Sequence, residues 1–270
     1  MRFNLTLQII GSGRTIPINY QYALHSWIYR VIQRADAEFS HFLHEQGYQQ
    51  GEKRFKLFTF SQLTGKPFRL FKEEQRIAFY GTEGAAPQLR LAVSFWLPEA
   101  AENFIRGLFL GQRFSLGDVI SQAEMEVERI EAMPRPVFGE VMQYQAVTPV
   151  VVSIREPDRK HPQYLPPDNE IYTGQLMKNL QHKAEAARLT VPMVAIAGEN
   201  KIWTDGWRMK RTSPFRKRGI TVKQYTTMQN KIIGYTYDVE LTAPPKIQQL
   251  AYYAGLGEDN SMGFGFLEIK

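Results

Sequence analysis

Hydrophobic and polar positions change their period several times along the chain, and each period predicts an element. Apolar side chains alternate with polar ones over residues 2–10, which is the pattern of a half-buried strand. The next segment repeats its apolar residues at helical spacing and predicts a helix whose buried stripe is Leu24, Trp27, Ile28, Val31 and Ile32. Tyr22, His25, Ser26 and Tyr29 fall outside that stripe.

The remainder of the first half predicts one short helix, two strands, a longer helix and a closing strand. These cover residues 37–46, 56–63, 88–96, 98–111 and 114–133. The short helix would bury Phe39, Phe42 and Leu43 and turn His41 and His44 outward. Pro98 suits the first turn of the longer helix. The resulting order, β-α-(α)-β-β-α-β, is that of a ferredoxin-like unit.

A similar order returns after a linker at residues 134–140. Strand patterns cover residues 141–154, 219–229, 231–241 and 263–269, and helical patterns cover residues 168–188 and 245–255. We therefore predict an α+β protein with two tandem ferredoxin-like, RRM-like domains, at residues 1–134 and 135–270.

Composition narrows the class of protein. The 270 residues suffice for two domains, and 43% of them are hydrophobic, which permits a sizeable core. The absence of cysteine excludes disulfides, thiolate nucleophiles and cysteine metal sites, and it suits a reducing cytoplasm. No apolar stretch approaches the roughly 20 residues needed to span a bilayer. We expect a cytoplasmic protein without a membrane partner, and the net charge of +6 favours a polyanionic one.

The densest positive charge lies between Trp207 and Lys223, where no acidic residue interrupts it. Trp207 and Phe215 are interleaved with basic residues that can neutralise phosphates, while aromatic rings can stack on bases. The basic residues are Arg208, Lys210, Arg211, Arg216, Lys217, Arg218 and Lys223. The segment also fits a solvated basic hairpin, but together with RRM-like sheets it predicts RNA binding.

Four glycines, Gly255, Gly257, Gly263 and Gly265, lie between the last predicted helix and the last predicted strand. Such a loop can present bare backbone N–H groups to phosphate. It can equally cap the helix and form a tight turn. The pattern leaves both roles open.

Candidate chemistry rests on a few polar residues of the first domain. His41 and His44 have the spacing of a metal pair, but a zinc site needs a third ligand and none is near in the sequence, so we predict no metal and no cofactor. Tyr29, His44 and Lys56 could instead act together on RNA. A histidine can protonate a leaving 5′-oxygen, a tyrosine can help to deprotonate a 2′-hydroxyl, and a lysine can stabilise charge on the phosphate.

Four segments resemble the CRISPR-associated repeat-RNA endoribonucleases, the Cas-six family of RAMP proteins. They are INYQYALHSWIYRVI, FLHEQ, KLFTFS and GLGEDNSMGFGFLEI, and the similarity covers nearly the whole chain. The family's glycine-rich loop, G-x-G-x(5)-G-F-G, matches residues 255–265. Its tyrosine in an Ile-Tyr pair matches Tyr29, its histidine in a Leu-His-Glu step matches His44, and its lysine before a Leu-Phe-Thr strand matches Lys56.

The resemblance implies a RAMP fold and a metal-independent, sequence-specific endoribonuclease that cuts CRISPR repeat RNA into guide units. Attack by the 2′-hydroxyl would leave a 2′,3′-cyclic phosphate and a 5′-hydroxyl. Tyr29, His44 and Lys56 would be catalytic, with His25 as a rival acid and Lys53 and Arg54 as rivals of Lys56. Besides repeat RNA, the family allows CRISPR effector subunits and a second copy of the chain as partners.

Two alternatives stay open. Some members of the family bind RNA without cutting it, so the chain could be a non-cleaving RNA-binding subunit of a CRISPR effector complex. It could also be an RRM-like RNA-binding protein outside CRISPR systems.

Overall fold

A computed structural model describes residues 1–82, 84–156, 161–189 and 206–270, which form two compact units. Unit 1 comprises Met1–Glu45, Phe60–Pro134 and Ile220–Lys231. Unit 2 comprises Gln46–Thr59, Arg135–Gly219 and Ile232–Lys270. The chain thus passes into unit 2 directly after Pro134. Residues 46–59, although in the N-terminal half, belong to unit 2, and residues 220–231, although in the C-terminal half, belong to unit 1. The division into domains 1–134 and 135–270 stays a prediction.

Unit 1 is built on a five-stranded sheet with the order β5-β8-β1-β10-β9. A three-stranded sheet of order β2-β7-β6 accompanies it. The elements in chain order are β1 (Arg2–Ile10), β2 (Thr15–Pro17), α1 (Gln21–Ala35), α2 (Ala37–His41), a π-helical turn η1 (Phe42–Gln46), β5 (Phe58–Phe60), β6 (Phe68–Phe71), β7 (Arg76–Phe79), β8 (Gln88–Phe95), α3 (Pro98–Leu110), β9 (Arg113–Gly117) and β10 (Gln122–Ala132).

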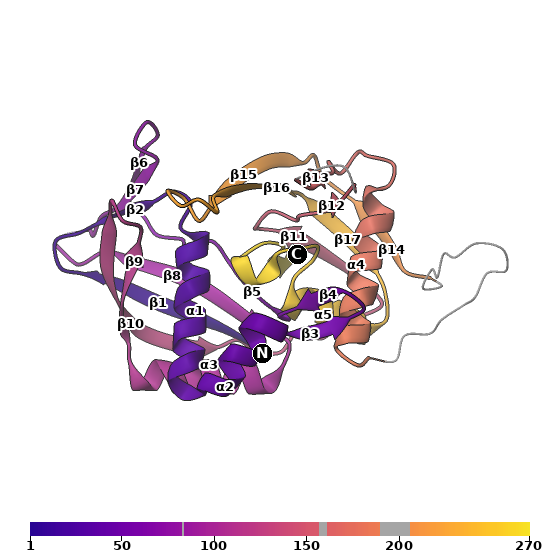
Figure 1. Ribbon diagram of the computed structural model, residues 1–270, viewed down its shortest axis with the longest axis horizontal. Coiled ribbons are helices and arrows are strands. Elements are labelled where there is room, and N and C mark those ends of the chain that lie inside the picture. Colours follow the sequence, from indigo (N-terminus) through magenta and orange to yellow (C-terminus); the bar gives the residue numbers. More distant parts are fainter. Residues whose placement is uncertain (83, 157–160, 190–205) are drawn as a thin grey trace. The chain divides into compact units, whose positions relative to one another are not determined.

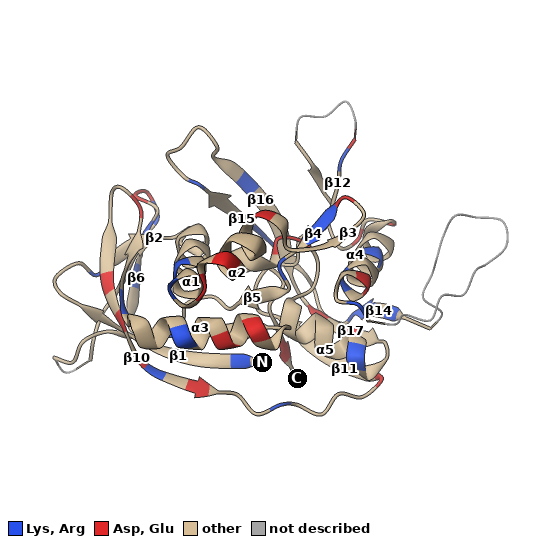
Figure 2. Cartoon of the chain, turned by 60° about the horizontal axis from the view of Figure 1, so that its bottom comes forward, with Lys and Arg blue, Asp and Glu red and all other residues tan. Residues whose placement is uncertain are grey.

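The large sheet has the connectivity of a ferredoxin-like fold. In chain order β1, α1, β5, β8, α3 and β10 give β-α-β-β-α-β, and β1 lies between β8 and β10 with both pairings antiparallel. Helices α1 and α3 pack against each other on one face of the sheet (Figures 1 and 2). The fold class predicted for the first half is therefore confirmed.

The core of unit 1 follows the predicted hydrophobic pattern. Leu5 and Leu7 of β1 are almost fully buried and pair across the sheet with Leu91 and Leu89. Trp27 on α1 is 1% exposed. Its ring stacks on Phe114 of β9, with ring centroids 4.2 Å apart. Burial of these large side chains fixes α1 and α3 on the sheet.

Unit 2 contains a four-stranded sheet of order β14-β17-β11-β18 and the two-stranded pairs β3-β4 and β12-β13. A third pair, β15-β16, lies in unit 2 except for Ile220–Lys231, which include its connecting loop and belong to unit 1. Across unit 2 and this pair, the elements are β3 (Tyr48–Gln50), β4 (Lys53–Phe55), β11 (Val141–Ala146), β12 (Ser153–Ile154), β13 (Gln163–Tyr164), α4 (Tyr172–Ala186), β14 (Arg208–Arg211), β15 (Arg216–Val222), β16 (Asn230–Thr236), β17 (Asp238–Thr242), α5 (Pro245–Ala254), a 3₁₀ turn η2 (Asn260–Met262) and β18 (Leu267–Ile269). The order β11, α4, β14, β17, α5, β18 again gives a ferredoxin-like unit, as predicted.

Several element predictions were wrong in detail, including the single strand at residues 231–241, which divides between β16 and β17. The second strand of the unit 2 sheet is β14 rather than residues 219–229, which pair instead as part of the separate β15-β16 hairpin. Residues 114–133 form a hairpin of β9 and β10, because Gly117 and Asp118 turn the chain where alternation alone predicted one strand. Residues 37–46 divide into α2 and the π-helical turn η1.

No helix within the described residues is long and apolar enough to cross a membrane.

The glycine-rich loop between α5 and β18 is part of the packed interior of unit 2. Gly255, Gly257, Gly263 and Gly265 are all buried, and their φ angles are +87°, +76°, +84° and +66°. A Cβ atom on Gly257 would lie 2.5 Å from the carbonyl oxygen of Val151, and one on Gly265 would lie 1.9 Å from that of Leu256. Packing and backbone conformation both require glycine at these positions.

The side chain of Lys183 on α4 is hydrogen-bonded to this loop. Its side chain is buried, and Nζ donates hydrogen bonds to the carbonyl oxygens of Gly255 (2.7 Å) and Gly257 (2.6 Å) and to Asn260 Oδ1. Three oxygen acceptors match the three N–H groups of an ammonium. Burial lowers the pKa of Lys183 to about 7, and the negative charge of Glu258 opposes this shift. The capping interpretation of the glycines is thus supported, and RNA contact by them stays a prediction.

We expect Gly265→Ala to destabilise the protein by about 2–5 kcal/mol, since the new Cβ adds a clash with backbone to the strain of a positive φ. Gly11→Ala is the matched control, because Gly11 also has a positive φ of +79° but nothing lies within 4 Å of its Cβ position. Its cost should be about 1–2 kcal/mol. Urea unfolding of both variants measures the difference. Equal stabilities would show that the loop is not tightly packed.

Candidate active site

Tyr29, predicted to lie outside the apolar stripe of α1, is buried, with 7% of its surface exposed. Its position outside the apolar stripe of α1 therefore does not place it outside the core. A second layer, α2 and the η1 turn, packs on that flank of α1 and covers it. Ser40 of α2 donates a hydrogen bond to the carbonyl oxygen of Tyr29 (3.3 Å). Burial raises the pKa of the Tyr29 phenol above its ordinary range, so the phenol stays protonated at neutral pH.

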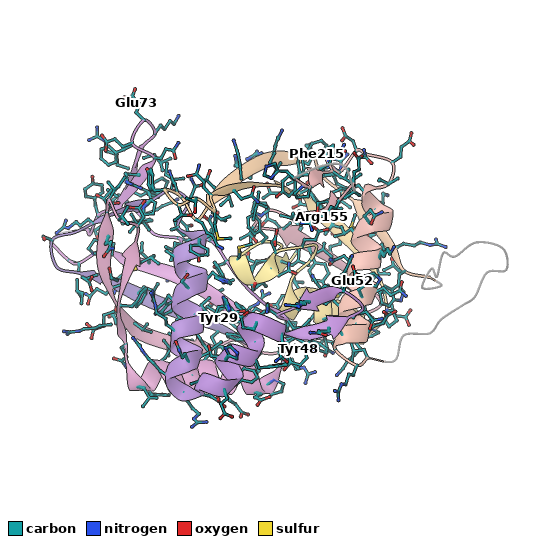
Figure 3. The ribbon with its side chains drawn as sticks, viewed as in Figure 1. Tyr29, Tyr48, Glu52, Glu73, Arg155 and Phe215 are labelled. Carbon is teal, nitrogen blue, oxygen red and sulfur yellow. The ribbon has the colours of Figure 1, made fainter. Side chains whose placement is uncertain are left out.

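Two histidines meet the Tyr29 ring within unit 1 (Tyr29 is labelled on α1 in Figure 3). The His44 and Tyr29 ring centroids are 5.1 Å apart, in an edge-to-face arrangement. Those of His25 and Tyr29 are 4.8 Å apart, and those of the two histidines 6.5 Å. The other side of His25 stacks on Tyr22 at 5.9 Å. The structure therefore brings together Tyr29, the predicted acid and its rival.

His44 is the most accessible member of this cluster. It lies on the π-helical turn η1, and 58% of its side chain is exposed. Its Nδ1 is 2.7 Å from Glu45 Oε1. When Nδ1–H donates to that carboxylate, the ring orientation is fixed and Nε2 is the ring nitrogen left to face a substrate. Sequence analysis did not identify this role of Glu45, although the residue adjoins His44.

Lys56 belongs to unit 2 and is placed by the β3-β4 hairpin, which residue patterns did not predict. In this hairpin Tyr48 pairs with Phe55 and Gln50 pairs with Lys53. One residue beyond the Tyr48–Phe55 pair, the same register places Lys56 opposite Gly47. A Cβ atom on Gly47 would be 3.1 Å from Lys56 Cδ and 3.3 Å from Nζ. The lysine side chain thus runs across a position that only glycine leaves open. Gly47 is the third residue after His44 in the chain.

The same register separates Lys56 from its rivals. Lys53 lies beside the turn of the hairpin, about 10 Å along the strand from Lys56, and Arg54 lies opposite Gln49. Figure 3 labels Tyr48 and Glu52, which mark the two ends of this hairpin. Of these three cations, only Lys56 lies at the end of the hairpin that the chain enters directly after the His44 turn.

The predicted basic segment does not form one surface element. Arg208, Lys210 and Arg211 are exposed on β14, the edge strand of the unit 2 sheet, which is blue in Figure 2. The exposed Arg216, Lys217 and Arg218 lie on β15.

Two aromatic contacts accompany these basic residues, one in each unit. The Arg211 guanidinium stands over the Phe215 ring at 5.2 Å. Lys223 is part of unit 1, where Nζ is 5.8 Å from the Tyr22 ring centroid. The predicted interleaving of aromatic and basic side chains is thus present at Phe215. RNA contact by this whole set stays a prediction.

No three His, Asp or Glu side chains of the described residues converge in a way that could hold a metal ion. His41, the partner considered for His44, is exposed on the preceding turn.

Comparison with known proteins identifies relatives along the whole chain. The family model for the C-terminal part of CRISPR-associated protein Cas6 matches residues 133–269, and the model for the N-terminal part matches residues 15–127. The CRISPR-associated endoribonuclease Cas6 1 of Methanocaldococcus jannaschii is 28% identical over 99% of this chain and 92% of its own length. The CRISPR-associated endoribonuclease Cas6 of Pyrococcus furiosus is 24% identical over 100% of this chain and 90% of its own.

A solved structure of a Cas6-related protein from Pyrococcus furiosus has the same fold. It superposes with a TM-score of 0.79 at 21% identity, covering 100% of this chain and 98% of the other. The two family models together span both ferredoxin-like halves of the sequence, and the chain belongs to the Cas6 family of CRISPR-associated proteins.

Proposed function

We propose that the protein is an endoribonuclease that cuts CRISPR precursor RNA within its repeats, without a catalytic metal ion. The observation that carries the proposal is the Tyr29–His44 pair, in which a buried phenol adjoins an exposed imidazole that is oriented by Glu45. The names of the relatives, both CRISPR-associated endoribonucleases, support the same reaction class.

His44 would act as the general acid. The 2′-oxygen attacks phosphorus, the bond from phosphorus to the 5′-oxygen breaks, and Nε2 of His44 donates its proton to that oxygen. The products are a 2′,3′-cyclic phosphate and a 5′-hydroxyl. His25 is less suited to this role, because it is half-buried between the rings of Tyr22 and Tyr29, whereas His44 is exposed to an incoming strand.

Tyr29 would orient the nucleophile rather than remove its proton. Its raised pKa leaves little phenolate at neutral pH, so a neutral phenol is the species that meets the substrate. The phenol oxygen can accept a hydrogen bond from the 2′-hydroxyl and fix its direction of attack, while the proton passes to water.

Lys56 would stabilise negative charge on the scissile phosphate. Its Nζ lies beside Gly47, and covalent geometry limits the Cα atoms of Gly47 and His44 to about 11 Å at most. The hairpin register therefore supports Lys56 over Lys53 as the third catalytic residue.

RNA binding outside the cut would use the basic residues of β14 and β15, Lys223, and the surface around the glycine-rich loop. Counterion release by arginine and lysine supplies affinity without sequence readout. Assembly with effector subunits, dimerisation and a cytoplasmic location follow from the family resemblance and from composition.

His44→Ala should slow single-turnover cleavage of repeat RNA by about 10²–10⁴-fold with little change in affinity, because a positioned acid contributes that much to the rate. The measurement is a gel-resolved time course at saturating protein, in excess chelator. His41→Ala, an exposed histidine on the preceding turn, is the matched control and should cut normally.

Cleavage that requires magnesium would contradict the mechanism. If His25→Ala abolishes cleavage and His44→Ala does not, His25 is the acid. A wild-type protein that binds the repeat and never cuts it would indicate the non-cleaving subunit.

Gly47→Ala should slow cleavage, since its methyl group would lie 2.7 Å from the Phe55 carbonyl oxygen and 3.1 Å from Lys56 Cδ and would shift Lys56 together with the end of β4. Gly51→Ala in the hairpin turn is the control, because Gly51 has a similar positive φ (+57° against +62°) but open space around it. A double-mutant cycle identifies the route of the effect. Combined with Lys56→Ala, the Gly47→Ala change should cost little further rate. A full additional loss there would show that Gly47 acts on the backbone and not through Lys56.

The ratio of wild-type to Tyr29→Phe rates should stay constant between about pH 6 and pH 9, because a phenol with a raised pKa is neutral throughout that range. A phenolate base would instead make the ratio rise about tenfold per pH unit. Rate profiles of both proteins over this range distinguish the two roles of Tyr29.

A further inference from the structure

A cluster of cations on unit 2 is left unused by the proposed reaction. Lys53 lies at the turn end of the β3-β4 hairpin, and both strands of this hairpin pack against α4. Lys178 and His182 lie on α4 at positions i and i+4, so they share one face of the helix. Figure 2 shows blue positions on both β4 and α4. Lys53 and Lys178 are exposed and His182 is half-buried.

Electrostatic interactions show that these three side chains act on one another. Burial lowers the pKa of His182, and the positive charges of Lys53 and Lys178 lower it further, against Glu185. Burial likewise lowers the pKa of Lys53, where Glu258 opposes and Lys178 reinforces the shift. A group of mutually repelling cations raises the free energy of the empty surface and favours an anion.

The acidic neighbours are already engaged by other donors. Glu258 accepts hydrogen bonds from the backbone N–H of Ser153 (3.2 Å) and from its hydroxyl (2.6 Å). Glu185 accepts one from Gln181 Nε2 (3.0 Å). On His182, the buried Nδ1 has no hydrogen-bond partner among the residues that the structure describes. An anion at the surface would therefore interact with the charge of the protonated ring rather than bond to this buried atom.

We propose that Lys53, Lys178 and His182 form a phosphate-binding site for the backbone of the bound RNA, separate from the phosphate that is cut. The proposal rests on the proposed function, which brings RNA to this protein. It gives Lys53 a binding role at the opposite end of the hairpin from Lys56. Two lysines bind phosphate as point charges, and a histidine that gains a proton adds a third. An RNA backbone is favoured over an acidic protein segment because the proposed function already brings RNA to this protein, and its regularly spaced phosphates suit a cluster of positive charges.

The first test is the salt dependence of affinity for a repeat RNA that carries a 2′-deoxy nucleotide at the cut and cannot be cleaved. Lys53→Gln with Lys178→Gln should reduce the log–log slope by about 1–2 units, because each lost phosphate contact removes about one. Lys66→Gln with Lys72→Gln makes the same charge change at exposed lysines of unit 1 and should leave the slope unchanged. Equal slopes for all three proteins would overturn the proposal.

The second test follows His182 itself by NMR, with His182→Gln to assign its ring signal. Its pKa should be low in the unbound protein and should rise when the uncleavable RNA binds, so affinity should increase as the pH falls through that range. Glu185, Lys53 and Lys178 are the charged groups acting on it. A pKa that rises equally with inorganic phosphate, and a salt slope unchanged in the double variant, would assign the site to free phosphate and overturn the proposal.

The binding test does not depend on catalysis. Because the RNA cannot be cut, a reduced slope would stand even if the wild-type protein failed to cleave ordinary repeat RNA. That second result would contradict the proposed function alone.

Discussion

The interaction on which unit 2 depends is the set of hydrogen bonds from the buried Lys183 ammonium to the glycine-rich loop. One side chain of α4 satisfies two loop carbonyls and Asn260, while Asn260 Nδ2 donates to the carbonyls of Leu256 and Phe264. Thr59, fully buried, donates to Phe264 from the segment that follows the β3-β4 hairpin. Loss of the lysine would leave several buried acceptors without donors, which is costly inside a protein.

This anchoring explains why the glycines carry no side chains. The loop is drawn close to the 150–152 segment and to its own first turn, so carbonyl oxygens occupy the space that a Cβ would need. The glycine-rich motif before the last strand is therefore explained first by close packing of the backbone.

Sequence periodicity predicted the two ferredoxin-like sheets because their long elements have strong, regular patterns, as in β1, α1 and α3. It failed at β14 and the β15-β16 hairpin, since a run of arginine and lysine has no apolar period to mark where one strand stops. It also missed β3 and β4, each of only three residues. At the candidate site, motif resemblance selected Tyr29, His44 and Lys56. Burial of Tyr29 could not be predicted, because the layer that covers it comes from α2 and η1 and not from α1.

In the proposed mechanism, the contrast in exposure between Tyr29 and His44 divides the chemistry between them. A general acid must exchange protons with water between turnovers, and the exposed imidazole of His44 is in contact with water. An orienting group benefits from the opposite environment, since burial keeps the phenol neutral and restricts its rotation. Edge-to-face contact at 5.1 Å holds the two rings in a fixed relation. The fold thus obtains two different functions from adjacent rings by covering one with α2 and η1 and placing the other on the outer side of the same turn.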